Sequence, residues 1–224
     1  KKLKITLISN AYNFFNVFML NHIQHLSKNY DLFICCNNPN RLKKLIPKNV
    51  SLININYKRG INIYHDIIAF FSTLFFFFKK KPDLTISFTP KIGFIVAISS
   101  FLTRIPNRIH WYTGQVWANK KGFSKKFFRF TDKVIFLLCH DVLVDGISQR
   151  KFLIKEKVIS KIKSSVLNQG SVGGVNIKKF KFNKKKRDKI RKDFLISKST
   201  FVFLYLGRIT QDKGITDLIE AFKK

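Results

Sequence analysis

Acidic residues are scarce in this chain of 224 residues. It has 12 Asp and Glu against 43 Lys and Arg, which gives a formal net charge of +31. A chain this basic attracts polyanions, so the charge favours nucleic acid or an anionic membrane surface as a partner. Lys, Asn, Ile and Phe share AT-rich codons, and such a bias explains part of the composition. It does not explain why Asp and Glu residues are so few. Part of the positive charge is therefore expected to serve a function.

Cysteine is equally scarce, and metal-binding patterns are missing. The three cysteines, Cys35, Cys36 and Cys139, form no CxxC pair, which predicts reduced thiols in a cytoplasmic protein. No Asp-x-Asp motif occurs. His22 and His25 have no further ligand near them in the sequence, so we expect a surface histidine pair and no metal site. No N-terminal signal is expected, because the chain leads directly into a predicted strand.

No apolar run is long enough to cross a membrane. The longest one, residues 67–78, spans ~18 Å as a helix, against ~30 Å for the hydrocarbon layer of a bilayer. Two interpretations remain open for it. It is either a helix buried against a sheet, or an interfacial patch whose phenylalanines enter lipid while the lysines at 79–81 contact anionic headgroups.

Alternating strand and helix patterns predict a Rossmann-like α/β domain with a parallel sheet. Apolar segments at residues 2–9 and 31–36 predict two strands, and helical periodicity between them completes a βαβ unit. Further strands are predicted at residues 50–55, 83–87, 108–112, 142–144 and 164–167. No GxGxxG motif follows the first strand, so no dinucleotide cofactor is expected there.

The clearest binding motif stands near the C-terminus. Residues 201–206 are continuously apolar, which predicts a buried strand, and residues 215–222 have helical periodicity. The loop between them contains Gly207, Arg208, Lys213 and Gly214. A guanidinium fork, an ammonium and two glycines before a helix N-terminus together favour capture of a diphosphate. The alternative is a solvated basic loop.

This loop resembles the one that opens the donor domain of family 4 retaining glycosyltransferases, which have the GT-B fold. The resemblance rests on Gly-Arg-Ile-Thr-Gln-Asp-Lys-Gly at residues 207–214. It implies that Arg208 and Lys213 hold the diphosphate of a nucleotide sugar and offset the charge on the leaving group, as catalytic residues. Gly207 and Gly214 would shape this loop. The nucleotide sugar is a substrate, and no cofactor or metal is implied.

Three more segments extend the resemblance. Residues 87–93, 106–110 and 113–117 follow the order found in bacterial family members that build surface polysaccharides. Residues 168–176 resemble the family's crossing between domains, which implies that Gly170 and Ser171 bind on the donor side of the cleft. The implied acceptor contacts are Asn10, Asn13, Thr89, Lys91, Thr113, Gly114, Gln115 and Trp117.

Two of these acceptor residues, Thr113 and Trp117, belong to the loop after the strand predicted at residues 108–112. Thr113 stands where many relatives have His or Arg, and His110 lies in the preceding strand, so the side chain that meets the acceptor is left open. Trp117 beside Gly114 and Gln115 is typical of a platform for a sugar ring, although a tryptophan that closes the core is the alternative. We expect the loops at residues 89–91 and 113–115 to lie side by side.

The predicted organisation has three parts. Residues 1–167 form the Rossmann-like acceptor-side domain, residues 168–200 form the inter-domain crossing and a basic linker, and residues 201–224 begin a donor domain. The paired glutamates of the family would lie beyond residue 224, so we expect this fragment to be inactive by itself.

The resemblance implies transfer of a hexose-type sugar from a nucleotide diphosphate sugar to a glycan or a polyprenyl-linked acceptor, in surface polysaccharide synthesis. The expected location is the cytoplasm, on the inner face of the bacterial cytoplasmic membrane, whose anionic surface would be a partner. No nucleic acid is expected. The alternative is a basic module without catalysis that binds nucleic acid or anionic lipid.

Overall fold

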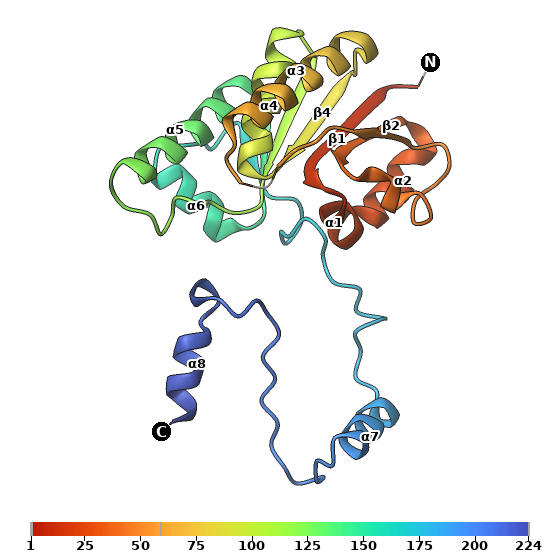
Figure 1. Cartoon of the computed structure of the whole chain (residues 1–224), viewed down its shortest axis with the longest axis vertical. Helices are drawn as coiled ribbons and strands as arrows, with labels where there is room; N and C mark the ends of the chain where they lie inside the picture. The colour runs from red at the N-terminus through yellow and green to blue at the C-terminus, as the bar shows by residue number, and fades with distance from the viewer. Residues whose placement is uncertain (1, 59, 224) are drawn as a thin grey trace. The chain divides into compact units, whose positions relative to one another are not determined.

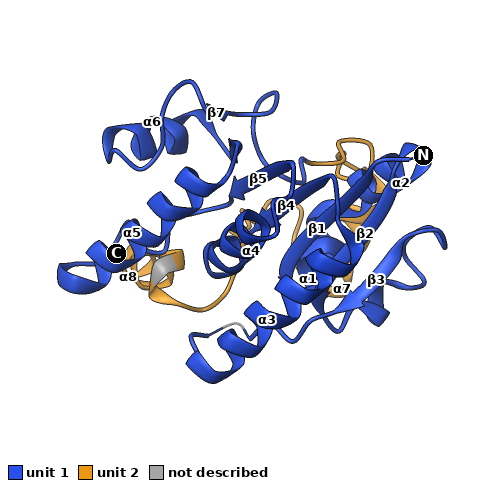
Figure 2. Cartoon of the chain, turned by 90° about the horizontal axis from the view of Figure 1, so that it is seen from above, with its two compact units in different colours: residues 1–174 blue, residues 175–224 orange. Residues whose placement is uncertain are grey.

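The computed structural model describes residues 2–58 and 60–223. Two compact units, Lys1–Gly174 and Val175–Lys224, are shown in different colours in Figure 2. Each unit is described by itself. The three predicted parts, residues 1–167, 168–200 and 201–224, stay predictions.

The first unit is built on a seven-stranded sheet in which every pair of neighbours is parallel. Its order is β3-β2-β1-β4-β5-β6-β7. The strands are β1 (Lys4–Ala11), β2 (Asp31–Asn37), β3 (Ser51–Asn54), β4 (Leu84–Phe88), β5 (Asn107–Tyr112), β6 (Asp141–Val144) and β7 (Ser164–Ser165). The order reverses between β1 and β4, where doubly wound sheets bind ligands at the carboxyl ends of the strands. The Rossmann-like α/β prediction for this unit is confirmed.

Helices cover both faces of this sheet. Helices α3 (Ile63–Lys80), α4 (Pro90–Leu102) and α5 (Gly122–Leu138) lie side by side along one face (Figure 1). The opposite face is covered by α1 (Tyr12–Phe14), the π-helical η1 (Phe15–Met19) and α2 (Leu20–Asn29). The remaining elements of the unit are the 3-10 helix η2 (Pro39–Leu42) and α6 (Ile147–Lys155).

Alternate residues of the central strand enter two different cores. Leu7 of β1 packs with Phe15 and Ile23, whereas the next residue, Ile8, packs with Phe77 of α3. Both faces of β1 are therefore buried, which explains why apolar residues occur at both odd and even positions of the strand. The three cysteines are free and buried, as their spacing predicted.

Strand β1 ends two residues later than the strand predicted at residues 2–9. It continues to Ala11, which pairs with Asn37 of β2, and helical structure begins at Tyr12. This helical segment packs one side against the sheet. Its fully buried side chains are Phe15, Met19 and Ile23, while Phe18 is 43% exposed.

The second unit contains α7 (Lys184–Asp193), the 3-10 helix η3 (Gln211–Lys213) and α8 (Ile215–Phe222). The helix predicted at residues 215–222 is confirmed. The buried strand predicted at residues 201–206 is wrong, because this segment is extended but pairs with no strand of the described chain, and Leu204 and Leu206 are exposed. A strand needs a neighbour for its backbone N–H and C=O groups, and no such neighbour stands beside this one.

Candidate functional site

The predicted acceptor residues of the first unit gather at the carboxyl edge of the sheet. Thr89 directly follows β4 and Thr113 directly follows β5, and these strands are neighbours with Phe88 opposite Trp111. Asn10 lies near the end of β1, the other neighbour of β4. The expectation that the loops at 89–91 and 113–115 lie side by side is confirmed. Asn13 is exposed in the short helix that follows β1.

Thr89 is held in an unusual backbone conformation. Its φ is 68° and its ψ is 140°, values that cost a β-branched residue on the order of 1–3 kcal/mol. Its carbonyl accepts a bond from the backbone N–H of Gly93 at 2.8 Å, which starts helix α4. Its hydroxyl is buried and has no hydrogen-bond partner among the residues that the structure describes. Strain and an unsatisfied hydroxyl thus coincide at one residue of the carboxyl edge.

Lys91 is engaged with the segment before α3. Its Nζ donates to the carbonyls of Lys58 at 2.9 Å and Gly60 at 2.5 Å, and it forms an ion pair with Asp66. Its charge therefore already has a carboxylate partner. The arrangement ties α4 to α3, and contact of Lys91 with an acceptor stays a prediction.

A pair of glutamines shapes the neighbouring loop. Gln149 of α6 donates through Nε2 to the carbonyl of Tyr112 at 3.3 Å and to Oε1 of Gln115 at 3.0 Å. The Nε2 of Gln115 is buried and, within the described residues, has no partner. An unsatisfied buried donor costs about 1–3 kcal/mol, so a substrate hydroxyl or a water molecule would stabilise this side chain. Gly114 beside it is exposed, with φ 146°.

Trp117 is not a sugar platform in this structure. Its side chain is fully buried, its Nε1 donates to Oδ2 of Asp132 at 2.6 Å, and its ring stacks on Phe152 with centroids 5.3 Å apart. A ring covered on its faces by protein cannot stack on a sugar, so the alternative of a tryptophan that closes the core is correct. The sequence feature that could have indicated this burial is Asp132, the only acidic residue of α5.

The glycine-rich loop after β7 is attached to the end of β6. The backbone N–H of Ser171 donates to the carbonyl of Asp145 at 2.7 Å. Gly170 has φ 98°, and a Cβ there would lie 2.3 Å from the same carbonyl oxygen, so this position requires glycine. The loop therefore reaches the carboxyl edge of the first unit. Donor contacts by Gly170 and Ser171 stay predictions.

Side chains outside the predicted site hold the same loop. Oδ1 of Asp145 accepts from Nε1 of Trp111 at 2.9 Å, and His22 Nε2 lies 2.8 Å from the carbonyl oxygen of Val172. Burial raises the pKa of Asp145, while the bond from Trp111 opposes this shift. The expected surface histidine pair is wrong for His22, which is half-buried, and correct for His25, which is exposed. The position of Asp145 directly after a strand was the available signal.

His110 points away from this edge. It is fully buried beneath α4, its Nδ1 lies 2.8 Å from the hydroxyl of Ser87, and a Cβ on Gly93 would come within 2.3 Å of its ring. Burial lowers its pKa to about 3, so the imidazole is neutral at physiological pH. It does not supply the acceptor contact that was left open.

The other four predicted donor residues, Gly207, Arg208, Lys213 and Gly214, belong to one loop of the second unit. Lys213 ends η3, Gly214 follows with φ 70°, and α8 begins at the next residue. Arg208 and Lys213 are exposed, and the carbonyl of Arg208 accepts from the Tyr205 hydroxyl at 2.7 Å. The local order of loop, glycine and helix N-terminus is the one that the motif predicted. Binding of a diphosphate by this turn stays a prediction.

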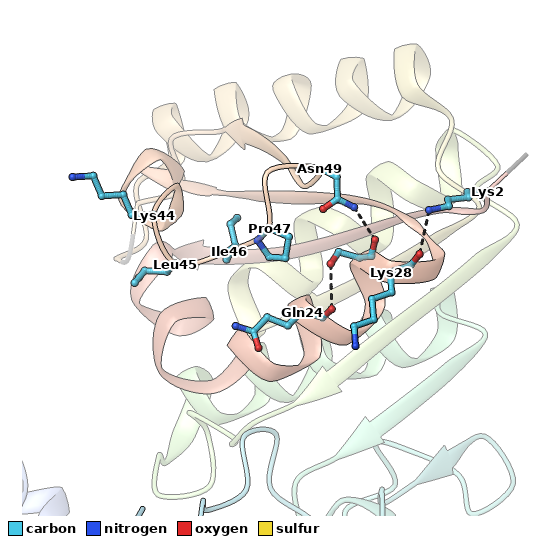
Figure 3. Close-up of a pocket in the computed structure, with 9 residues that line it drawn as sticks. Lys2, Gln24, Lys28, Lys44, Leu45, Ile46, Pro47 and Asn49 are labelled. Atoms are coloured by element: carbon cyan, nitrogen blue, oxygen red, sulfur yellow. Dashed lines mark hydrogen bonds between the residues drawn. The ribbon is translucent and has the colours of Figure 1, made fainter.

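No cluster of three or more metal-ligating side chains occurs in the part of the chain that the structure describes. A hollow of about 570 Å³ lies elsewhere, between the C-terminal end of α2 and the segment before β3 (Figure 3). Its lysine Lys2 donates to the carbonyl of Lys28 at 3.1 Å. This hollow stands at the amino edge of the sheet, opposite the candidate acceptor residues, so it is not part of the site.

Comparison with known proteins gives one close sequence relative. The chain is 31% identical over 197 residues to the capsular polysaccharide biosynthesis glycosyltransferase CapM of Staphylococcus aureus, and the match covers 88% of this chain. The chain is a relative of CapM. It spans about half of that protein's length, since the match covers 50% of CapM. No protein-family model matches the chain.

Solved structures agree with this relationship at the level of fold. Anabaena Alr3699/HepE, solved in complex with UDP and glucose, superposes with a TM-score of 0.69 at 15% identity, over 98% of this chain and 57% of HepE. The UDP-GlcNAc 2-epimerase of Neisseria meningitidis gives a TM-score of 0.57 at 15% identity, over 88% of this chain and 54% of the epimerase. The chain therefore resembles proteins of GT-B-like fold, and that fold by itself does not choose between sugar transfer and epimerisation.

Proposed function

We propose that this chain is part of a glycosyltransferase that moves a sugar from a nucleotide diphosphate sugar to a glycan or lipid-linked acceptor in polysaccharide synthesis. The observation that carries the proposal is the 31% identity to CapM over 88% of the chain. The donor motif at residues 207–214 also supports it, because its two cations and two glycines suit a diphosphate. A UDP sugar is the donor class that we propose.

The first unit would bind the acceptor and the second unit would bind the diphosphate of the donor. At the carboxyl edge of the sheet, the unsatisfied Thr89 hydroxyl and Gln115 amide are suited to bind acceptor hydroxyl groups. In the second unit, Arg208 would bind two phosphate oxygens and Lys213 would add a second positive charge. These cations would stabilise the negative charge that develops on the departing diphosphate. Because residues 207–214 resemble the donor loop of family 4 enzymes, we propose a retaining, metal-independent transfer of the family 4 type.

The proposed location is the inner face of the cytoplasmic membrane. Among the described residues, no helix combines the length and hydrophobicity needed to pass through a bilayer. A lipid-linked acceptor would be presented at the membrane surface, and the strongly basic chain suits an anionic one. We propose peripheral attachment there.

Nucleotide binding tests the proposal. We would titrate UDP and a UDP sugar into the longest natural form of the protein, into Arg208→Ala, and into Lys198→Ala, an exposed cation outside the motif. The proposal expects saturable binding that is lost in the first variant and unchanged in the second. Steeply salt-dependent binding of any polyanion, without preference for nucleotide, would favour the basic binding module instead.

Product analysis separates the two reactions that share this fold. The protein is incubated with a radiolabelled UDP sugar, with and without a polyprenyl-phosphate-linked acceptor. Sugar transfer places the label on the acceptor and requires it. Epimerisation inverts one carbon of the sugar supplied as the UDP sugar and needs no acceptor, and that result would overturn the proposal.

A further inference from the structure

Helix α3 exposes an apolar stripe on the side that faces away from the sheet. Its buried side chains Ala69, Thr73 and Phe77 follow one another at intervals of four and face the core. Ile63 is exposed at the first position of the helix, and six further exposed apolar side chains have the same helical spacing: Tyr64, Ile67, Ile68, Phe71, Phe75 and Phe78. No charged residue occurs between Asp66 and Lys79. A surface helix normally exposes polar residues, so this helix is apolar on both sides.

Helix α5 repeats the pattern with basic residues interleaved. Its exposed apolar side chains are Phe123, Phe127, Phe130 and Leu137. Lys126 and Lys133 are exposed between them. This alternation of phenylalanine and lysine along one helix side is the composition of a segment that lies at a membrane interface.

The two stripes belong to one layer of the molecule. Helix α4 packs between α3 and α5 on the same face of the sheet and exposes Phe101 and Leu102 at its end (Figure 1). We refer to these exposed apolar residues of α3, α4 and α5 as the α3–α5 surface. Helix α2, on the opposite face of the sheet, exposes Asn21, Gln24, His25 and Lys28 instead. The α3–α5 surface therefore has no counterpart on α2, although η1 before α2 exposes Val17 and Phe18.

The charges around this surface are positive. Helices α3 and α5 contain two acids, of which Asp66 is paired with Lys91 and Asp132 is buried. Lysines stand at both ends of the layer: residues 79–81 at the end of α3, and residues 120, 121, 125 and 126 at the start of α5. Such lysines can extend to lipid phosphates while their alkyl chains cover apolar surface.

We propose that the α3–α5 surface binds the face of an anionic lipid bilayer. The aromatic side chains enter the boundary between headgroups and acyl chains, roughly 5–10 Å deep, and the surrounding lysines contact lipid phosphates. The sign of the charge decides between this partner and a second copy of the chain. Two basic α3–α5 surfaces repel each other, whereas an anionic bilayer attracts each of them.

This orientation has a consequence that rests on the proposed sugar transfer. The crossover helices run back from the carboxyl edge, so α5 begins at that edge, where Thr113 and Gln115 lie. A bilayer that lies against the α3–α5 surface therefore ends close to the candidate acceptor residues Thr113 and Gln115. A polyprenyl-linked acceptor could be bound there without leaving the membrane.

Vesicle co-sedimentation tests the surface without any sugar nucleotide, so its failure would leave the proposed reaction untouched. The probes are phosphatidylcholine vesicles and vesicles in which about a third of the lipid is phosphatidylglycerol. The main variant is Phe71→Gln/Phe75→Gln/Phe78→Gln, whose side chains are 59%, 69% and 69% exposed. We expect binding to anionic vesicles to weaken about tenfold or more. Circular dichroism should be unchanged, because glutamine is a good helix former and these side chains are not in the core.

A matched control exists in the second unit. Phe180, Phe182 and Phe194 are 70%, 77% and 73% exposed, so Phe180→Gln/Phe182→Gln/Phe194→Gln removes the same apolar area elsewhere. We expect this variant to bind like the parent. Equal losses from both triple variants would overturn the proposal, because they would indicate binding that is not local to the α3–α5 surface.

The lysines give a second, electrostatic test. Lys126→Gln/Lys133→Gln should weaken binding to anionic vesicles about fivefold per lysine and leave binding to neutral vesicles unchanged. Its control is Lys185→Gln/Lys189→Gln, an exposed pair of α7. A larger loss from the control pair would contradict the assignment. A second result would also contradict it. Sedimentation velocity would show that the parent self-associates and that the phenylalanine variant does not, while neither protein binds vesicles.

Discussion

The indole Nε1 of Trp117 lies 2.6 Å from Oδ2 of Asp132, and neither side chain reaches solvent. This hydrogen bond joins the loop after β5 to the middle of α5. The backbone carbonyl of Asp132 also accepts from the hydroxyl of Tyr112 at 2.6 Å. One acid of α5 thus fixes two aromatic side chains that close the core beneath the candidate acceptor loop.

Replacing this acid should destabilise the first unit. Asp132→Ala leaves the indole N–H of Trp117 buried without a partner, and we expect the free energy of unfolding to fall by about 1–3 kcal/mol. Asp141→Ala is the control, because Asp141 is exposed at the start of β6. Urea denaturation followed by tryptophan fluorescence measures both. A loss no larger than that of the control would show that the hydrogen bond contributes nothing to stability.

The same carboxyl should make stability depend on pH. Burial raises the pKa of Asp132 from 3.8 to about 7, with the Trp117 bond opposing the shift. The folded chain therefore holds a proton that the unfolded chain releases, so this contribution is complete below pH 3.8 and is lost as pH rises through about 7. Asn at this position can accept the indole bond but cannot ionise. We expect the stability of Asp132→Asn relative to the parent to increase between about pH 4 and about pH 7 and to stay level above that range. A constant difference across this range would contradict the assignment.

Gly170 should tolerate no side chain. Its φ of 98° and the 2.3 Å separation between a built Cβ and the Asp145 carbonyl oxygen predict that Gly170→Ala displaces the loop and breaks the bond from the Ser171 N–H. We expect faster hydrogen exchange at the Ser171 amide and a loss of about 1–3 kcal/mol. Gly146→Ala is the matched control, since nothing lies within 4 Å of a Cβ there. Unchanged exchange in Gly170→Ala would refute the attachment.

The sequence predicted the sheet because its strands are buried on both faces and carry their own signal. Leu7 and Ile8 of β1 face different cores, and the polar Thr6 and Ser9 beside them are buried as well. The same signal misled at residues 201–206, which are equally apolar but have no neighbouring strand in the described chain. Hydrophobicity reports what a segment can bury, while strand formation also requires a partner.

The site was predictable only in part, for a related reason. Thr89 and Thr113 could be placed together, because the carboxyl ends of neighbouring parallel strands meet at one edge. The attachment of Ser171 to Asp145 could not be predicted, because it is a backbone contact between residues 26 positions apart, which leaves no side-chain pattern in the sequence. The burial of Trp117 depended in the same way on a distant partner on α5.

Relieving the backbone strain at Thr89 should raise stability and slow sugar transfer. Thr89→Gly relieves the positive φ of 68° and removes an unsatisfied buried hydroxyl, so we expect the free energy of unfolding to rise by about 1 kcal/mol. Arg104→Gly is the matched control, because Arg104 has φ 54° but is exposed at the amino edge of the sheet. Both variants should gain stability, and only Thr89→Gly should slow sugar transfer by the longest natural form of the protein. If transfer slows in both variants or in neither, Thr89 is not part of the acceptor site. The reason is that a strained residue is retained where the strain serves binding, so relieving the strain at that residue should lower activity.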